Sequence, residues 1–174
     1  MDFNLLKKLI LSVVSITPMT TETTNLPHRI AAGGLVFYED RVLLVRYSNN
    51  NGSGILVAPG GALNPNENIE DAIIREVFEE TAVTVQPLTI VMVEDLVCSK
   101  YKMSKTWMVC RYLSGHPDLT EEARIEGINR VDWYAREQLE SEIVFPTILK
   151  EMDWGKIMGL KNDVHIPKSR RMLF

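Results

Sequence analysis

The sequence predicts an α/β fold of the α+β type, in which strands and helices pack around one core. The order of segments is the first basis: apolar, β-prone stretches precede one strongly patterned helix, and further such stretches and one or two weaker helices follow it. This order differs from the regular alternation of parallel βαβ units. Size is the second basis, since 174 residues suit one domain with a sizeable core. Composition is the third, because 45% apolar and 24% charged residues are typical of globular proteins.

The β-prone stretches are short apolar runs bounded by turn-forming residues. We expect strands over residues 30–38, 41–46, 55–58, 83–86, 89–97, 106–113 and 131–134. Only the polar pair Glu39-Asp40 separates the first two stretches, which predicts a β-hairpin. A flexible loop is expected over residues 48–54, and the third strand ends at Pro59-Gly60-Gly61.

The clearest helix is expected over residues 68–81. Asn68 is a typical N-cap, and Glu70 and Asp71 place carboxylates in the first turn, where the helix dipole favours negative charge. Weaker helical patterns cover residues 135–142 and 146–152.

The chain is expected to divide into an N-terminal extension or linker, a domain and a C-terminal tail, at residues 1–27, 28–152 and 153–174. In the extension, Lys7-Lys8 precede an apolar run over residues 9–16, and no small-x-small cleavage site follows. A signal peptide has such a site, and a membrane span needs about 20 apolar residues. We therefore expect a cytoplasmic protein without a membrane partner. Two alternatives stay open: translation starts at Met19, or residues 5–16 form a helix that contacts a second copy in a homodimer.

Charge and cysteine content exclude several classes of function. A net charge of −4 argues against a nucleic-acid partner, because backbone binding needs clustered Lys and Arg. A small anionic substrate remains compatible, since a metal ion can supply positive charge. Cys98 and Cys110 lie in apolar stretches, so we expect buried, reduced thiols rather than a disulfide. The spacing of His28, His116 and His165 suits no zinc site.

Three carboxylates share one side of the predicted helix. Glu76, Glu79 and Glu80 lie at i, i+3 and i+4, so their side chains are neighbours. The apolar residues on the two flanks of this stripe are Ile73, Ile74, Val77 and Phe78. We expect both flanks to be buried, which leaves the carboxylates in a partly covered groove where a cation would compensate their charge. Oxygen ligands suit Mg²⁺ or Mn²⁺, whereas a solvated acidic face is the plainer alternative.

The glycine turn and this helix together carry a longer pattern. It runs from Gly61 through five residues to Glu67, then through seven more to Arg75-Glu76-Val77-Phe78-Glu79-Glu80-Thr81-Ala82-Val83. This pattern resembles the Nudix box, GX5EX7REUXEEXGU with U an aliphatic residue, at every specified position except Ala82, where the family has glycine. The resemblance implies the Nudix fold, a mixed β-sheet sandwiched between helices, and a hydrolase of the pyrophosphatase type.

The resemblance also implies roles for individual residues. The implied ligands of Mg²⁺, for which Mn²⁺ is a substitute, are Glu76, Glu79, Glu80 and the backbone carbonyl of Gly61. Glu79 is implied either as a further ligand or as the base that acts on the attacking water, so the implied catalytic residues are Glu79, Arg75 and Glu76. Arg75 is expected to hold Glu79 through an i, i+4 pair, and Glu67 to support Arg75 or a metal-bound water.

Ala82 is the one departure from the family pattern. It falls at the end of the helix, where glycine suits a residue with positive φ. An alanine that keeps this conformation costs about 1 kcal/mol. All the acidic residues of the box are present, so we expect an active enzyme.

The implied function is cleavage of a diphosphate linkage in a nucleoside diphosphate linked to another moiety, such as a nucleotide sugar, a dinucleoside polyphosphate or a nucleoside triphosphate. The expected partner is therefore a small nucleotide-like diphosphate. One alternative is a Nudix-like module that senses a nucleotide without cutting it, and another is a structural domain with an acidic helix. Candidate substrate-binding residues outside the box are Arg46, Tyr101, Trp107 and Glu126, the last of them in an expected loop over residues 120–129.

Overall fold

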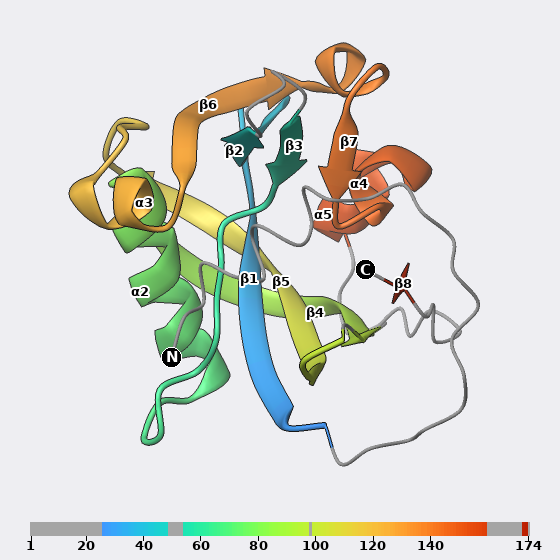
Figure 1. Ribbon diagram of the computed structural model, residues 1–174. Coiled ribbons are helices and arrows are strands. Elements are labelled where there is room, and N and C mark those ends of the chain that lie inside the picture. Colours follow the sequence, from blue (N-terminus) through green and yellow to red (C-terminus); the bar gives the residue numbers. More distant parts are fainter. Residues whose placement is uncertain (1–25, 49–53, 98, 160–171, 174) are drawn as a thin grey trace.

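The computed structural model describes residues 26–48, 54–97, 99–159 and 172–173 (Figure 1). The strands are β1 (His28–Tyr38), β2 (Arg41–Ser48), β3 (Gly54–Val57), β4 (Thr84–Val97), β5 (Lys102–Ser114), β6 (Ile128–Ala135), β7 (Ile143–Phe145) and β8 (Met172–Leu173). The helices are α2 (Ile69–Thr81), α3 (Glu121–Ile125), α4 (Ile148–Glu151), α5 (Trp154–Gly159) and the 3₁₀ helix η1 (Arg136–Leu139). The N-terminal extension up to residue 25, most of the predicted loop over residues 48–54, and Cys98 lie outside the described residues.

The strands form one mixed sheet in the order β7-β3-β2-β1-β5-β4-β8, and β6 pairs with β2 beside this path. β1 pairs in parallel with β5 over nearly its whole length, but with β2 only at the two positions beside the turn. Glu39 and Asp40 form that turn with φ values of 48° and 58°. β2 continues beside β3 and β6, so the two strands of the predicted hairpin diverge into the two halves of a curled sheet (Figure 1).

Helix α2 packs its apolar side against one face of the sheet. Ile73 and Val77 are fully buried in a cluster with residues of β1, β2, β4 and β5. The helix lies so close to β1 that a Cβ added to Gly34 would stand 3.0 Å from Val77. The prediction that both flanks of the carboxylate stripe are buried is wrong. Ile74 and Phe78 are 39% and 54% exposed, because the helix turns this flank away from the sheet.

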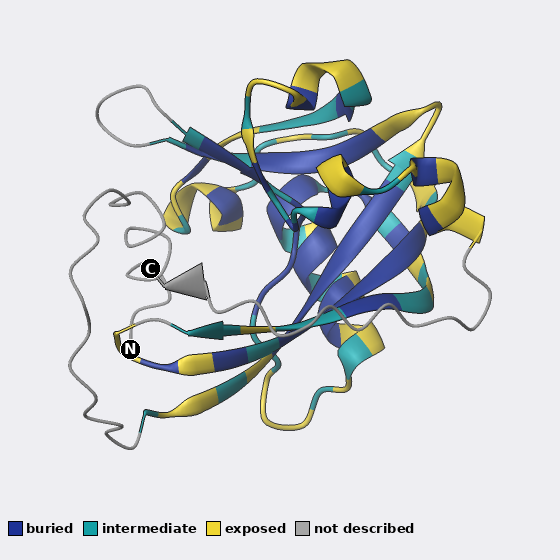
Figure 2. Ribbon diagram, turned by 90° about the vertical axis from the view of Figure 1, so that its right-hand side faces the viewer, coloured by how far each residue is buried: buried dark blue, intermediate teal, exposed yellow. Residues whose placement is uncertain are grey.

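The C-terminal helices cover the opposite face. Leu35 of β1 and Trp107 of β5 pack in one buried cluster with α4 and with Trp154 and Ile157 of α5. Val36, the next residue of β1, belongs instead to the cluster under α2, as expected for alternating side chains of a strand. The sheet therefore lies between α2 and the pair α4 and α5, which confirms the predicted architecture (Figures 1 and 2).

Several boundaries differ from the prediction. The strands expected over residues 83–86 and 89–97 are the single strand β4, whose pairing with β5 shifts register near Pro87. The expected loop over residues 120–129 contains α3, and the short strand β7 is absent from the prediction. The expected C-terminal tail begins with α5, which contributes buried side chains to the core. Among the described residues, no helix has both the length and the apolar character needed to span a bilayer.

Candidate active site

The glycine turn that follows β3 lies directly against β1. The Ala32 N–H donates to the Gly61 carbonyl at 2.9 Å, and the Gly34 N–H donates to the Pro59 carbonyl at 3.0 Å. Gly60 has a φ of 146°, and a Cβ at this position would collide with the carbonyl of Ala32. Glycine is therefore required both for the backbone conformation and for the close approach of the turn to β1.

Glu76 extends from α2 to the backbone of this turn. A Cβ added to Gly61 would collide with both carboxylate oxygens of Glu76. The residue is only 6% exposed, and its carboxylate accepts a hydrogen bond from Arg75 Nη1 at 2.9 Å. The absence of a side chain at Gly61 thus makes the space in which the Glu76 carboxylate meets the backbone of the turn.

Glu80 lies one helical turn beyond Glu76 and is 2% exposed. Its Oε2 accepts a hydrogen bond from the Gly60 N–H at 3.0 Å, and its Oε1 accepts one from the Tyr47 hydroxyl at 3.3 Å. Burial, followed by the negative charge of Glu80, holds the pKa of Tyr47 well above its usual value, so the hydroxyl remains a donor. Glu76 and Glu80 therefore both face the glycine turn.

Arg75 connects the remaining acidic residues of the motif. Its Nε and Nη2 donate to the two carboxylate oxygens of Glu67, each at 2.7 Å. Its Nη1 donates to Glu76 and Glu79, each at 2.9 Å, and its Nη2 also donates to the Ala62 carbonyl at 3.2 Å. The hydrogen bond between Arg75 and Glu67 is the main cause that raises the pKa of the arginine and lowers that of the glutamate. Glu79, with a side chain 40% exposed, is more accessible than Glu76.

Negative charge accumulates where Glu76 and Glu80 meet the turn. Burial, and next the charge of Glu80, raises the pKa of Glu76 to about 7, although Arg75 acts in the opposite direction. Glu126 contributes to the same upward shift. A cation held between these carboxylates would remove much of this unfavourable charge.

The short helix α3 brings Glu126 toward the carboxylates. The hydroxyl of Thr120, the N-cap of α3, donates to the carbonyl of Glu79 at the end of α2. Glu126 follows the last turn of α3 and is half-buried, and its charge also contributes to the raised pKa of Tyr47. This candidate substrate residue is therefore close enough to influence the site.

Two other candidate substrate residues take part in contacts within the fold. Arg46 donates to both carboxylate oxygens of Glu142, at 3.2 and 2.5 Å. Tyr101 is buried, and the Arg29 guanidinium lies 4.5 Å from the centroid of its ring. Both side chains therefore have partners within the fold.

Lys105 also lies in this region, although no sequence motif indicates it. It is buried on β5, and its Nζ donates to the Gly60 carbonyl at 3.1 Å. The same ammonium group lies 4.3 Å from the centroid of the Trp107 ring, and the Trp107 indole N–H donates to Glu94 at 2.7 Å. In the sequence, Lys105 directly precedes an apolar stretch. This local pattern does not indicate that its side chain contacts Gly60, which is 45 positions away.

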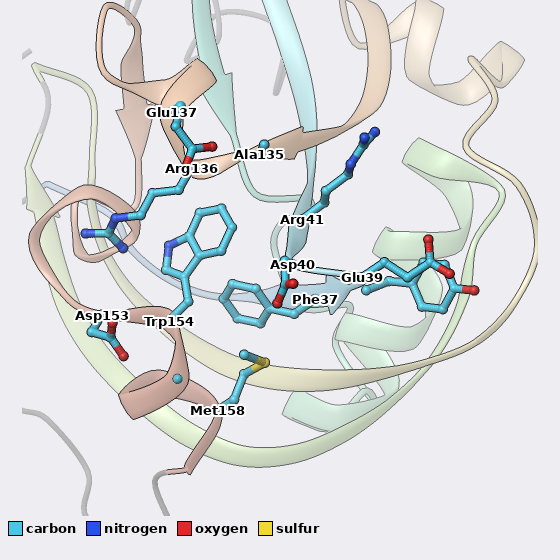
Figure 3. Close-up of a pocket in the computed structure, with 12 residues that line it drawn as sticks. Phe37, Glu39, Asp40, Arg41, Ala135, Arg136, Glu137, Asp153, Trp154 and Met158 are labelled. Atoms are coloured by element: carbon cyan, nitrogen blue, oxygen red, sulfur yellow. The ribbon is translucent and has the colours of Figure 1, made fainter.

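A pocket of about 700 Å³ opens between the β1–β2 turn and α5 (Figure 3). The rings of Phe37 and Trp154, with centroids 5.4 Å apart, lie together in its wall. Arg136, also in the wall, donates to the carbonyls of Lys150 and Met152 and so joins η1 to α4. The residues that line this pocket include none from α2 or the glycine turn, so it is separate from the site described above.

The donors at the glycine turn fit a hard divalent cation. The Glu76 and Glu80 carboxylates and the backbone of Gly61 supply only oxygen atoms, which suits Mg²⁺ or Mn²⁺. In the described part of the chain, however, no three His, Cys, Asp or Glu side chains are grouped closely enough to form a metal site as they stand. Glu79 is one reason, since it is bound to Arg75.

The motif, the sheet and the helix arrangement together define a class of protein, and comparison with known proteins gives the same class. A NUDIX domain family model matches residues 27–153. The chain belongs to this family. A MutT protein from Methanosarcina mazei Go1 has the same fold, with a TM-score of 0.60, 25% identity, and coverage of 74% of this chain and 92% of that one.

Two curated relatives match shorter segments. An ADP-ribose pyrophosphatase from Methanocaldococcus jannaschii is 35% identical over 52 residues, which are 30% of this chain and 31% of that protein. The 8-oxo-dGDP phosphatase NUDT18 of Mus musculus is 26% identical over 117 residues, which are 67% of this chain and 35% of that protein. The chain thus spans about a third of the length of each of these relatives.

Proposed function

We propose that this protein is a Mg²⁺-dependent hydrolase that cuts a diphosphate linkage in a nucleoside diphosphate linked to another moiety, with Mn²⁺ as a substitute metal. The observation that carries the proposal is the convergence of two buried carboxylates, Glu76 and Glu80, on the Gly60-Gly61 turn. Burying two adjacent carboxylates is costly, and a bound cation would offset this cost beyond what Arg75 and the hydrogen bonds to Glu80 already do. Membership of the NUDIX family supports the same function.

In this proposal, Glu76, Glu80 and the Gly61 carbonyl hold the metal, and Glu79 is either a further ligand or the general base. A bound divalent cation neutralises the diphosphate and acidifies a bound water. Arg75 orients Glu79 through a 2.9 Å hydrogen bond, and Glu67 holds Arg75 in place. The accessibility of the Glu79 carboxylate favours it as the group that takes a proton from water.

The reaction is a hydrolysis at phosphorus. The water oxygen forms a bond to one phosphorus of the diphosphate, the bridging P–O bond breaks, and the proton goes to a carboxylate of the site. The products are a nucleoside monophosphate and a second phosphorylated fragment, or pyrophosphate when a triphosphate is cut. Glu126 is retained in the proposal as a residue near the substrate, because its charge reaches Glu76.

The substrate class can be narrowed by a hydrolysis screen. The names of two relatives contain ADP-ribose and 8-oxo-dGDP, so we include both compounds beside nucleotide sugars, dinucleoside polyphosphates and nucleoside triphosphates. We expect release of phosphorylated products from at least one of them with Mg²⁺ or Mn²⁺, and none with EDTA. The alternative, a module that senses a nucleotide without cutting it, predicts binding of a nucleotide without product under every condition.

A further inference from the structure

We infer that Lys105 is a positioning residue for the metal ligands at the glycine turn, and that it acts through the backbone of Gly60. The inference rests on the proposed function, because the groups that it concerns are the proposed ligands Glu80 and Gly61. Lys105 lies on β5, whereas the carboxylates lie on α2. Gly60 is the residue at which contacts from these two elements meet.

Gly60 is held from both sides by charged groups. Its N–H donates to Glu80 Oε2 at 3.0 Å, and its carbonyl accepts from Lys105 Nζ at 3.1 Å. The next carbonyl, that of Gly61, accepts from the Ala32 N–H at 2.9 Å. Hydrogen bonds thus fix the two successive peptide units that carry the Gly60 and Gly61 carbonyls.

The position of the Lys105 ammonium group is itself well defined. The side chain is buried and lies 4.3 Å from the centroid of the Trp107 ring, a distance that suits a cation–π contact. The Trp107 indole is fixed by its 2.7 Å hydrogen bond to Glu94, and its ring fills the space that Gly33 leaves without a side chain. Lys105 therefore approaches Gly60 from a rigid part of the sheet.

Loss of the Lys105 hydrogen bond would release a peptide between two glycines, the residues whose backbone rotates most freely. The Gly61 carbonyl and the hydrogen bond to Glu80 would then lose their fixed geometry. Outer partners of metal ligands typically contribute 10- to 100-fold to metal affinity when they orient a ligand. We therefore expect Lys105 to affect metal affinity although it is not itself a ligand.

The test measures Mn²⁺ binding to the full chain without substrate, by electron paramagnetic resonance of free Mn²⁺. Lys105→Met removes the charge and the donor at similar size, and we expect its Kd for Mn²⁺ to rise by about 10-fold. Lys105→Arg keeps a charged donor and should recover part of the affinity. Lys102→Met, an exposed lysine on the same strand, is the matched control and should bind as the wild type does.

The possible outcomes separate the two proposals. Wild-type protein that binds no Mn²⁺ would overturn the proposed metal site and the inference with it. Wild-type protein that binds Mn²⁺ while Lys105→Met binds it equally well would overturn the inference alone, and a raised KM in that variant would then assign Lys105 to direct contact with substrate. Should Lys105→Met fail to fold by circular dichroism, Lys105→Gln carries the same expectation, and unchanged affinity in that variant would also overturn the inference.

Discussion

Burial and the nearby charge of Glu80 both oppose ionisation of Glu76, and they raise its pKa to about 7. A carboxyl group whose pKa is higher in the folded than in the unfolded state stabilises the fold at low pH, and this contribution is lost as pH rises through the folded-state value. We predict that, without divalent cations, Glu76 lowers the free energy of unfolding by up to about 3 kcal/mol between about pH 4.5 and pH 8. Urea denaturation in EDTA across this range measures the change.

The matched variant for this prediction is Glu76→Gln, which cannot ionise. Its free energy of unfolding should fall less than that of the wild type over the same pH range. Adding Mg²⁺ at pH 8 should restore stability to the wild type and have little effect on the variant. Identical pH profiles for the two proteins would show that the charge of Glu76 is not destabilising in the folded state.

Ala82 ends α2 in the left-handed conformation, with φ 58° and ψ 16°, and its N–H donates to the Phe78 carbonyl at 2.8 Å. This confirms the positive φ that the family glycine implies at this position. We predict that Ala82→Gly raises the free energy of unfolding by about 1 kcal/mol, because glycine adopts this conformation without strain. Ala72→Gly, inside the same helix, should do the opposite. A neutral or destabilising result for Ala82→Gly would mean that the αL conformation costs nothing here.

Helix α2 and the glycine turn act as one unit, because the Glu76 carboxylate occupies the space beside Gly61. We predict that Gly61→Ala displaces this carboxylate and weakens Mn²⁺ binding by at least about 10-fold, while the fold survives, since the displaced group is the end of a flexible side chain. Gly159→Ala is the control, because a Cβ there meets nothing within 4 Å. Equal Mn²⁺ affinity in Gly61→Ala and the control would contradict the proposed ligand geometry.

The elements that the sequence predicts well are those with strong local patterns. Helix α2 has an N-cap at Asn68, whose side chain accepts from the Asp71 N–H as expected, and an apolar side of helical period. β7 and α3 are too short to carry such a pattern. β7 exists because it pairs with β3, and α3 is joined to α2 through Thr120, so both depend on partners distant in sequence.

The exposed side of α2 differs from the prediction because of helical geometry. Consecutive residues of a helix are about 100° apart, so Ile73 lies beside the carboxylate stripe, whereas Ile74 lies on the side of the helix away from it. In the structure Ile73 is buried and Ile74 is exposed. The apolar character of Ile74 and Phe78 alone therefore does not predict burial.

The core of the protein extends into α5, beyond the predicted domain end at residue 152. The Trp154 indole N–H donates to the Leu149 carbonyl at 2.8 Å, and its ring contacts Phe37. We predict that Trp154→Ala lowers the free energy of unfolding by about 3 kcal/mol or more, as measured by chemical denaturation. Met158→Ala, exposed on the same helix, is the control and should change stability little. An equally small effect of Trp154→Ala would show that α5 does not contribute to the core.

The candidate site could be predicted from sequence only where its residues share one motif. The Nudix box brings together Gly61, Glu76 and Glu80, because the turn and the helix are close in sequence. Lys105 joins them through a hydrogen bond across 45 positions, which no local pattern encodes. Tyr47 reaches Glu80 in the same way from β2. The long-range part of the site thus follows from the packing of the sheet.

Turnover of Glu80→Gln on the best substrate of the screen, at saturating Mg²⁺, shows whether the charge of a buried carboxylate is needed for catalysis. Glutamine keeps the size of the side chain and removes its charge. We predict that kcat falls by at least about 100-fold, in the range of other losses of charge stabilisation, while circular dichroism and the melting temperature show a folded protein. A folded Glu80→Gln protein with a kcat close to that of the wild type would contradict the assignment of the buried carboxylates as metal ligands.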